Sequence, residues 1–139
     1  MKDLNFTSAQ IKEISTSQTT NIDLSLTQID DIENYNYMLI IRSETNRYTR
    51  ITIYPLKKHK IIKLTLWDIK KIDEYAEIFS KNLQKYGIIH STGLVMIDGL
   101  VNLECYLNMS LNEEKYKGLI FFLDKNKKNI KEIQIMEIS

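Results

Sequence analysis

The sequence contains one cysteine, one proline and only four glycines in 139 residues. One cysteine excludes an internal disulfide and any zinc site built from several thiolates. No window approaches the roughly 18 consecutive apolar residues of a membrane-spanning helix, so we expect no membrane association. The polar start, Met1 to Asn5, predicts no signal peptide. A lone thiol, Cys105, suits a reducing compartment, and we therefore expect a cytoplasmic protein.

The chain also lacks an excess of charge of either sign. Nineteen basic and eighteen acidic residues leave a formal net charge of +1. This balance disfavours a strongly cationic nucleic-acid-binding protein. Hydrophobic residues make up 43% of the chain and charged residues 27%, which is typical of a folded globular protein.

The clearest pattern follows residue 60. Apolar and other residues alternate from Ile61 to Trp67, which predicts a strand. Asp68 is a candidate N-cap and Gly87 a candidate C-terminal stop, and apolar residues recur between them at steps of three and four. The spacing predicts a helix over 68–86. The residues of its apolar stripe are Ile69, Ile72, Ala76, Phe79, Leu83 and Tyr86.

A hairpin is predicted next, because Asp98-Gly99 separates two β-like segments and suits a two-residue type I′ turn. That turn places Ile97 opposite Leu100 and, further along, Thr92 opposite Cys105 and His90 opposite Leu107. Asn102 would then lie on a mixed face, where we expect partial exposure. The mostly apolar face comprises Ile88, His90, Thr92, Leu94, Met96, Val101, Leu103, Cys105, Leu107 and Met109.

The last predicted elements are a helix and a strand. Ser110 and Glu113 have the spacing of a capping box. The helix that follows has Tyr116, Leu119, Ile120 and Leu123 on one stripe. Ile130–Ile138 reads as a strand, and two sets of residues compete for its inward face: Ile133 and Ile135 against Ile130, Met136 and Ile138.

The first half of the chain reads as β-rich. A hairpin is predicted from residues 38–43 and 48–54. A strand is predicted over residues 21–26 and a short helix over residues 8–14. We therefore expect an α+β fold with a ferredoxin-like βαββαβ domain over residues 58–139. Its antiparallel sheet should have the strand order 4-1-3-2, with two helices on one face. A β-rich extension over residues 1–57 should precede this domain and pack on it. The open sheet face is apolar enough to need covering, either by the N-terminal strands or by a second copy of the chain.

The element order of residues 60–139, with the glycine-punctuated segment Ser91-Thr92-Gly93-Leu94 after a long helix, resembles ACT domains, which sense amino acids and related metabolites. The resemblance implies a non-enzymatic regulatory domain that forms a homodimer and binds a small molecule near the interface. It also implies a ligand loop at 67–72, with Asp68 as its acidic residue. The candidate ligand-binding residues are Trp67, Asp68, Ile69, His90, Ser91 and Thr92.

Catalytic signals are few. His90 and Cys105 share a predicted face and could form a thiolate pair, but a packed histidine beside a cysteine acting as a small hydrophobe fits that apolar face better. No nucleotide-binding or nucleophile-elbow motif is present, and we expect neither a cofactor nor a metal. The alternatives are a protein-interaction module that uses its open sheet face or edge and, more weakly, a nucleic-acid-binding protein.

Overall fold

The computed structural model describes residues 9–109 and 113–138 of the chain. They separate into two units, one ending at Ile32 and the other running from Glu33 onward. All seven strands and both α-helices of the described chain belong to the second unit, so the fold is α+β with antiparallel sheets. No helix in these described ranges is long and apolar enough to cross a membrane.

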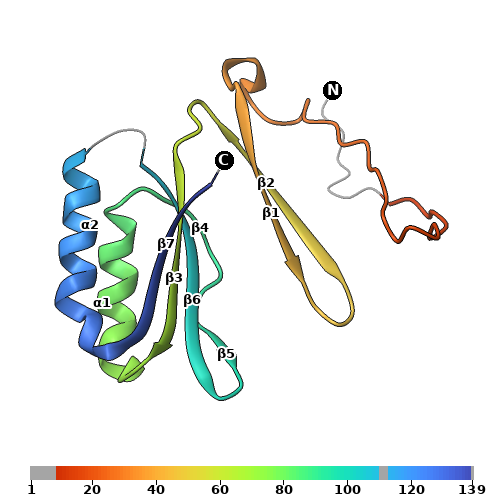
Figure 1. Ribbon diagram of the computed structural model, residues 1–139. Coiled ribbons are helices and arrows are strands. Elements are labelled where there is room, and N and C mark those ends of the chain that lie inside the picture. The colour runs from red at the N-terminus through yellow and green to blue at the C-terminus, as the bar shows by residue number, and fades with distance from the viewer. Residues whose placement is uncertain (1–8, 110–112, 139) are drawn as a thin grey trace. The chain divides into compact units, whose positions relative to one another are not determined.

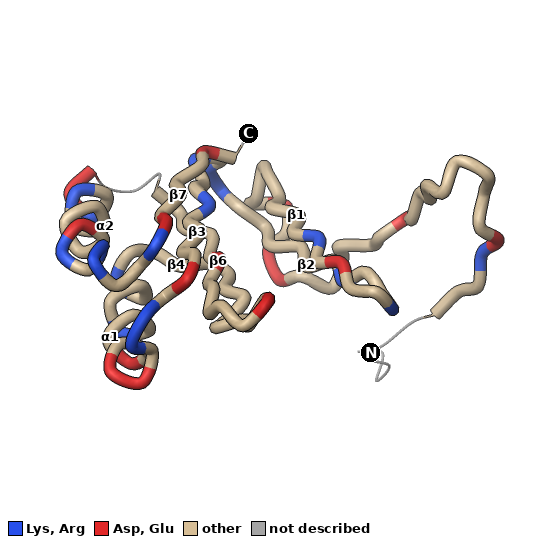
Figure 2. Tube along the Cα trace, turned by 60° about the horizontal axis from the view of Figure 1, so that its bottom comes forward, with Lys and Arg blue, Asp and Glu red and all other residues tan. Residues whose placement is uncertain are grey.

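The larger sheet has the strand order β4-β6-β3-β7, with every neighbouring pair antiparallel, and β5 pairs with β6 alone. Its strands are β3 (Ile61–Ile69), β4 (Ile88–Ser91), β5 (Val95–Ile97), β6 (Leu100–Asn108) and β7 (Ile130–Ile138). Two helices, α1 (Ile72–Gln84) and α2 (Glu113–Asn126), cover the same face of this sheet (Figure 1). Acidic and basic positions both occur on each helix and along β7 (Figure 2).

The main core lies between the sheet and the two helices. Ile62, Leu64 and Leu66 of β3 all point into it, so the predicted alternation of this strand is confirmed. Phe79 and Leu83 of α1 pack against them. Burial of such side chains stabilises the fold by about 1.5–3 kcal/mol each. The core therefore fixes which sheet face carries the helices.

The predicted start of α1 is wrong. Asp68 is not an N-cap: it belongs to β3, which continues to Ile69, and the helix begins at Ile72 after Lys71. Asp68 has a left-handed backbone, with φ 55°, and Lys71 has φ 54°. The turn at Asp68 interrupts the alternation, so Ile69 joins the core with Leu66. At the other end Gly87 has φ 73°, which agrees with a glycine stop, and a Cβ there would lie 3.0 Å from the Asn108 carbonyl oxygen.

The Asp98-Gly99 turn is confirmed, but the pairing derived from it fails farther from the turn. Both turn residues have positive φ, and Ile97 lies opposite Leu100 as predicted. Beyond the break at 92–94 the register slips by one residue, because Ser91 and not Thr92 faces Cys105. A second irregularity follows between Ile88 and His90. His90 therefore lies opposite Tyr106 and not Leu107, on the sheet face away from the helices.

The α2 helix presents a different face from the one predicted. Leu119 and Leu123 are buried as expected, but Phe122 completes the buried stripe. Tyr116 and Ile120 are 40% and 36% exposed. The predicted capping box begins at Ser110, which lies outside the described residues. The helix therefore leaves two large apolar side chains on one flank.

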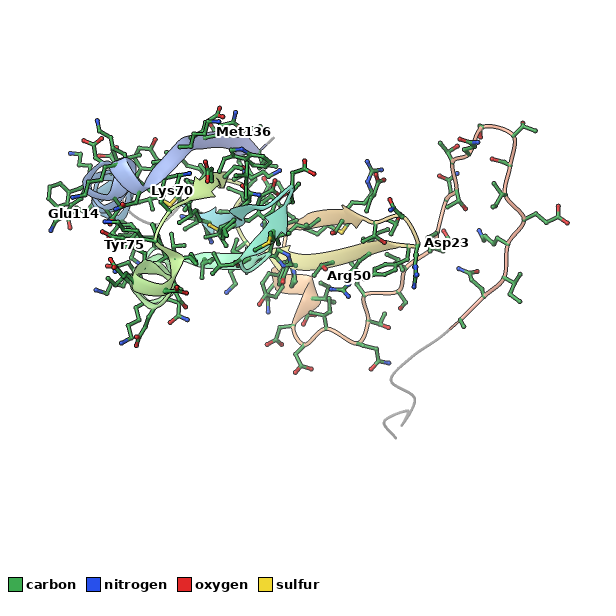
Figure 3. All side chains as sticks on the ribbon, turned by 90° about the horizontal axis from the view of Figure 1, so that it is seen from below. Asp23, Arg50, Lys70, Tyr75, Glu114 and Met136 are labelled. Atoms are coloured by element: carbon green, nitrogen blue, oxygen red, sulfur yellow. The ribbon has the colours of Figure 1, made fainter. Side chains whose placement is uncertain are left out.

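The pairing of β7 decides which of its faces points inward. Ile133 and Ile135 lie opposite Leu66 and Leu64, on the helix side, and Ile133 packs against the core. Met136 lies opposite Lys63 on the other face, is 53% exposed and projects from the strand (Figure 3). Ile130 also reaches the core, because it lies opposite Ile69 beyond the turn at Asp68.

The predicted hairpin near residues 38–54 is confirmed. Strand β1 (Tyr37–Glu44) pairs with β2 (Thr49–Leu56) as a separate two-stranded sheet. One face of this hairpin packs against the larger sheet on the side away from the helices. The hairpin residues of this second cluster are Leu39, Ile41, Tyr54 and Leu56, and the sheet residues are Ile61, Ile89, Tyr106 and Ile138.

The first unit contains neither the strand predicted at 21–26 nor, in its described part, the helix predicted at 8–14. Ser15, Ser17 and Thr19 instead form local side-chain hydrogen bonds, which compete with regular backbone pairing. Ile11 and Ile14 are almost fully exposed. Alternating or periodic apolar residues form no strand or helix here, since most of the stability of such elements comes from packing.

Candidate functional site

A groove of about 380 Å³ opens between α1 and the end of β4, within the second unit. Its apolar lining includes Phe79, Leu83 and Leu103, and its polar lining includes Ser80, Gln84 and Ser91. The volume lies within the roughly 300–1,000 Å³ of small-molecule sites, which typically combine an apolar lining with a few polar groups. This groove is the candidate functional site.

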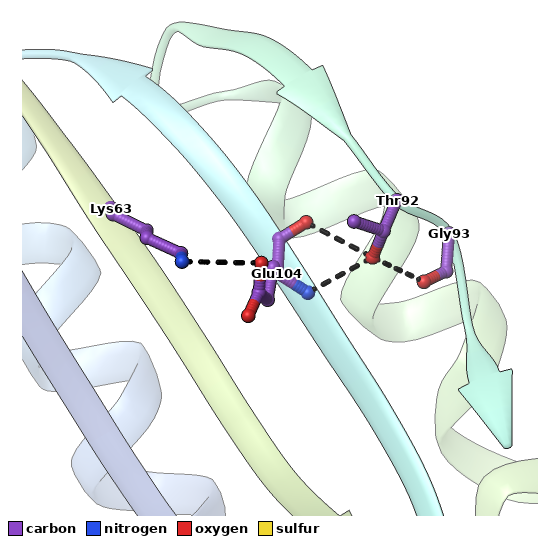
Figure 4. A network of polar contacts seen from close by, with 4 residues as sticks. All are labelled: Lys63, Thr92, Gly93 and Glu104. Carbon is purple, nitrogen blue, oxygen red and sulfur yellow. Dashed lines mark hydrogen bonds and ion pairs between the residues drawn. The ribbon is translucent and has the colours of Figure 1, made fainter. Parts of the chain in front are cut away.

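The loop after β4 is held in place by polar contacts to β6 (Figure 4). The Thr92 backbone N–H donates to the Glu104 carbonyl at 3.0 Å, and the Glu104 N–H donates to the Thr92 hydroxyl at 3.1 Å. The Gly93 N–H donates to the Ser91 hydroxyl at 3.0 Å. Lys63 forms an ion pair with the Glu104 carboxylate at 3.3 Å. These contacts position Ser91 at the groove through the loop beside it.

His90 also lines the groove, but its ring bonds elsewhere. Its Nδ1 atom lies 2.7 Å from the Tyr54 hydroxyl in a hydrogen bond. The ring also makes an edge contact with Tyr106, at 6.2 Å between centroids. His90 therefore joins hairpin β1–β2 to the sheet: the packed, structural histidine was predicted, but its Tyr54 partner was not.

The predicted ligand residues divide between different places. His90 and Ser91 line the groove and Thr92 adjoins it through the loop. Trp67 instead borders a shallow depression with Thr65 and Gln134, on the sheet face opposite the helices. Ile69 is buried in the main core at 4% exposure. The structure therefore does not bring the six candidates together.

Asp68 occupies a buried junction between β3 and α1. Its backbone N–H donates to the Asn102 Oδ1 atom at 3.1 Å, and its carboxylate pairs with Lys70 at 3.1 Å. Asn102 is only 4% exposed and donates its own N–H to the Leu100 carbonyl at 3.0 Å. The expectation of partial exposure for Asn102 is wrong, because this amide satisfies the backbone of the left-handed turn.

The Cys105 thiol is not placed for nucleophilic chemistry. Its side chain is fully buried in the main core, while His90 lies on the other sheet face. Burial raises the pKa of the Cys105 thiol from 9.0 to about 12. Across the described residues, no group of three or more His, Cys, Asp or Glu side chains is arranged to hold a metal ion.

Cys105 should resist a thiol reagent at pH 8 in the folded protein and react only on unfolding, as followed by absorbance with and without denaturant. The raised folded pKa also predicts a pH dependence. The contribution of the Cys105 thiol to the free energy of unfolding should be fully present below pH 9 and be lost as the pH rises towards 12. The reason is that the thiol of the unfolded chain ionises at a lower pH than the buried thiol of the folded chain. Equally fast labelling of folded and unfolded protein would contradict this environment.

Several groove residues were not identified from the sequence as site residues. Phe79 and Leu83 were assigned to the helical core stripe, and they serve both core and groove. Ser80 and Gln84 are exposed, uncharged and one helical turn apart. Two uncharged polar residues one turn apart, on a helix whose exposed positions are mostly charged, were the available signal.

An exposed apolar segment adjoins the groove. Leu94 lines the groove, and from it four consecutive apolar residues are exposed at 45%, 38%, 71% and 43%. They are Leu94, Val95, Met96 and Ile97. We call this segment the β5 arm.

Comparison of the chain with protein-family models, with curated proteins and with solved structures finds no match.

Proposed function

We propose that this chain is a non-enzymatic, ACT-like regulatory domain that binds a small molecule in the groove between α1 and β4. The observation that carries the proposal is the groove itself, with its apolar lining and its uncharged polar residues Ser80, Gln84 and Ser91. The strand order β4-β6-β3-β7, with both helices on one face, supports assignment of residues 61–138 to the ferredoxin-like class. The inaccessible Cys105 thiol supports binding rather than catalysis.

The lining also indicates what kind of molecule fits. Among the described residues that line the groove, His90 is the only titratable one, and its Nδ1 already bonds Tyr54. A zwitterionic amino acid would lose hydration there without gaining a charged partner, which is costly. The groove therefore favours an uncharged molecule with an apolar body and a few hydrogen-bonding groups.

A thermal-shift screen tests the proposal. A bound molecule at about 100 times its Kd stabilises by about 2.7 kcal/mol, which raises Tm by roughly 5–10 °C in a domain of this size. Ser80→Tyr, which fills the groove from α1, should abolish the shift. Lys81→Tyr, at the next exposed position but not at the groove, should retain it. Absence of any shift across a broad set of neutral and charged metabolites would overturn the proposal.

A protein-interaction module is the second candidate, and the β5 arm favours it. Four exposed apolar residues in a row are unusual on a solvated surface and typical of a contact with another chain. This function requires no small molecule. Met96→Lys places a charge in the β5 arm and should weaken contact with another chain. If this variant keeps the thermal shift that a small molecule gives with the wild type, the two functions use separate surfaces.

A further inference from the structure

The two edges of the larger sheet differ in how well they are protected. The β4 edge is short and irregular, since β4 has four residues and its register shifts between Ile88 and His90. The β7 edge has nine residues, no proline and an uninterrupted register with β3 from Ile138 to Glu132. Within the described chain β7 pairs only with β3. Long regular edges of this kind expose backbone donors and acceptors to another strand.

The sequence of β7 is complementary to itself in one antiparallel register. When two copies pair about Gln134, each Lys131 lies opposite the other copy's Glu137, and each Ile133 lies opposite an Ile135. Each Ile130 also lies opposite an Ile138, so the register gives two ion pairs and four apolar pairs per dimer. A shift of one residue loses both ion pairs. In one direction it opposes Glu132 to Glu137 instead, which is repulsive.

The charged residues that would pair in this register are available to a second copy of the chain. Lys131 and Glu137 are exposed, and no ion pair joins either of them to another described residue. Ile135 is 36% exposed although it lies on the helix side of the sheet. The edge therefore combines unpaired backbone, unpaired charges and incompletely buried apolar side chains.

A second surface continues this edge. Tyr116 lines a cavity of about 550 Å³ together with Ile135 and Glu137, which places this flank of α2 beside β7. Ile120 lies one helical turn further along, and Gly118 on the opposite flank faces Tyr86. Tyr116 and Ile120 are the exposed large apolar side chains on this flank, while Phe121 is exposed elsewhere on the helix. Edge pairing of two copies would bring these flanks towards each other.

We propose that two copies of this chain associate through antiparallel pairing of their β7 strands about Gln134, with the Tyr116 and Ile120 flanks of α2 covering the junction. The partner is a second copy because the charge pattern matches its own reverse. The interface is separate from the groove, so it goes beyond the proposed ligand binding and can fail independently of it.

Charge reversal tests the register. Lys131→Glu and Glu137→Lys each replace two attractive pairs with two repulsive ones, so each should weaken the dimer at least about tenfold. The double variant Lys131→Glu/Glu137→Lys inverts both pairs and should return the Kd to within about threefold of wild type. Glu132→Lys is the matched control, because Glu132 lies opposite Met136 and should change the Kd little. Sedimentation over about 1–500 μM gives these constants.

Cysteine cross-linking tests the same geometry without changing charge. In the proposed register Gln134 lies opposite itself, with Cβ atoms about 5 Å apart, within reach of a disulfide after small adjustments. Gln134→Cys should therefore form a covalent dimer with oxidised glutathione. Met136→Cys is the control on the same face: its two copies would lie about 13 Å apart along the strands and should not cross-link. The native Cys105 is fully buried and should not contribute.

Three results would overturn the inference. The first is a wild-type chain that is monomeric throughout the concentration series. The second is a dimer that Lys131→Glu and Glu137→Lys leave unchanged, which would place the contact on another surface such as the β5 arm. The third is equal cross-linking at positions 134 and 136. Thermal unfolding of every variant checks that the fold is retained.

Discussion

Leu103→Asp is expected to leave the chain unfolded at neutral pH. Leu103 is 5% exposed, lies opposite Leu66 and belongs to the main core. A carboxylate there would be buried without a partner, which costs more than about 4 kcal/mol. That loss approaches the roughly 5–15 kcal/mol that stabilises an ordinary domain. Circular dichroism and thermal melting should show no cooperative transition.

Leu94→Asp is the matched control for this variant. It makes the same chemical change in the same hairpin, but Leu94 is 45% exposed. The introduced charge stays hydrated there, so a loss of no more than about 1 kcal/mol is expected. A Leu103→Asp protein that melts like the wild type would show that β6 does not present Leu103 to the helices.

Asn102→Asp is expected to destabilise the fold by about 2–3 kcal/mol although the two side chains have nearly the same shape. The Asn102 amide donates to the Leu100 carbonyl at 3.0 Å and is 4% exposed. A carboxylate would set an acceptor against that carbonyl and bury a charge. Urea unfolding of both proteins measures the difference.

Asn82→Asp separates burial from the loss of a hydrogen bond. The Asn82 amide also donates to a backbone carbonyl, that of Ile78, at 2.7 Å, but at an exposed position on α1. Water can replace this bond, so the loss should be less than about 1 kcal/mol, including the effect of a negative charge near the helix end. Equal losses at the two positions would contradict the buried role of Asn102.

The sequence was most informative where a local pattern had one physical meaning. Alternation identified the core face of β3, and Asp98-Gly99 identified a turn whose residues both have positive φ. It was least informative where tertiary contacts override the local pattern. The left-handed turn at Asp68 depends on an amide from β6, and nothing within the segment 67–72 could indicate that partner.

The candidate site shows the same division. His90 was assigned to the helix side by counting from the turn, and two irregularities in β4 and its loop moved it to the other face. One residue of slip reverses the face of every residue beyond it. Ser80 and Gln84 carry no motif, so only the fold could place them beside Ser91.

The position of β3 in the sheet has a consequence for the order in which the chain can fold. β3 is paired on one side by β6 and on the other by β7, and α1, β4, β5, β6 and α2 all lie between β3 and β7 along the chain. During synthesis one side of β3 therefore stays unpaired until β7 has emerged from the ribosome. Contacts between such distant segments slow folding. In that interval β3 can accept β7 from another molecule, so concentrated nascent or refolding chains should be most prone to strand exchange at this position.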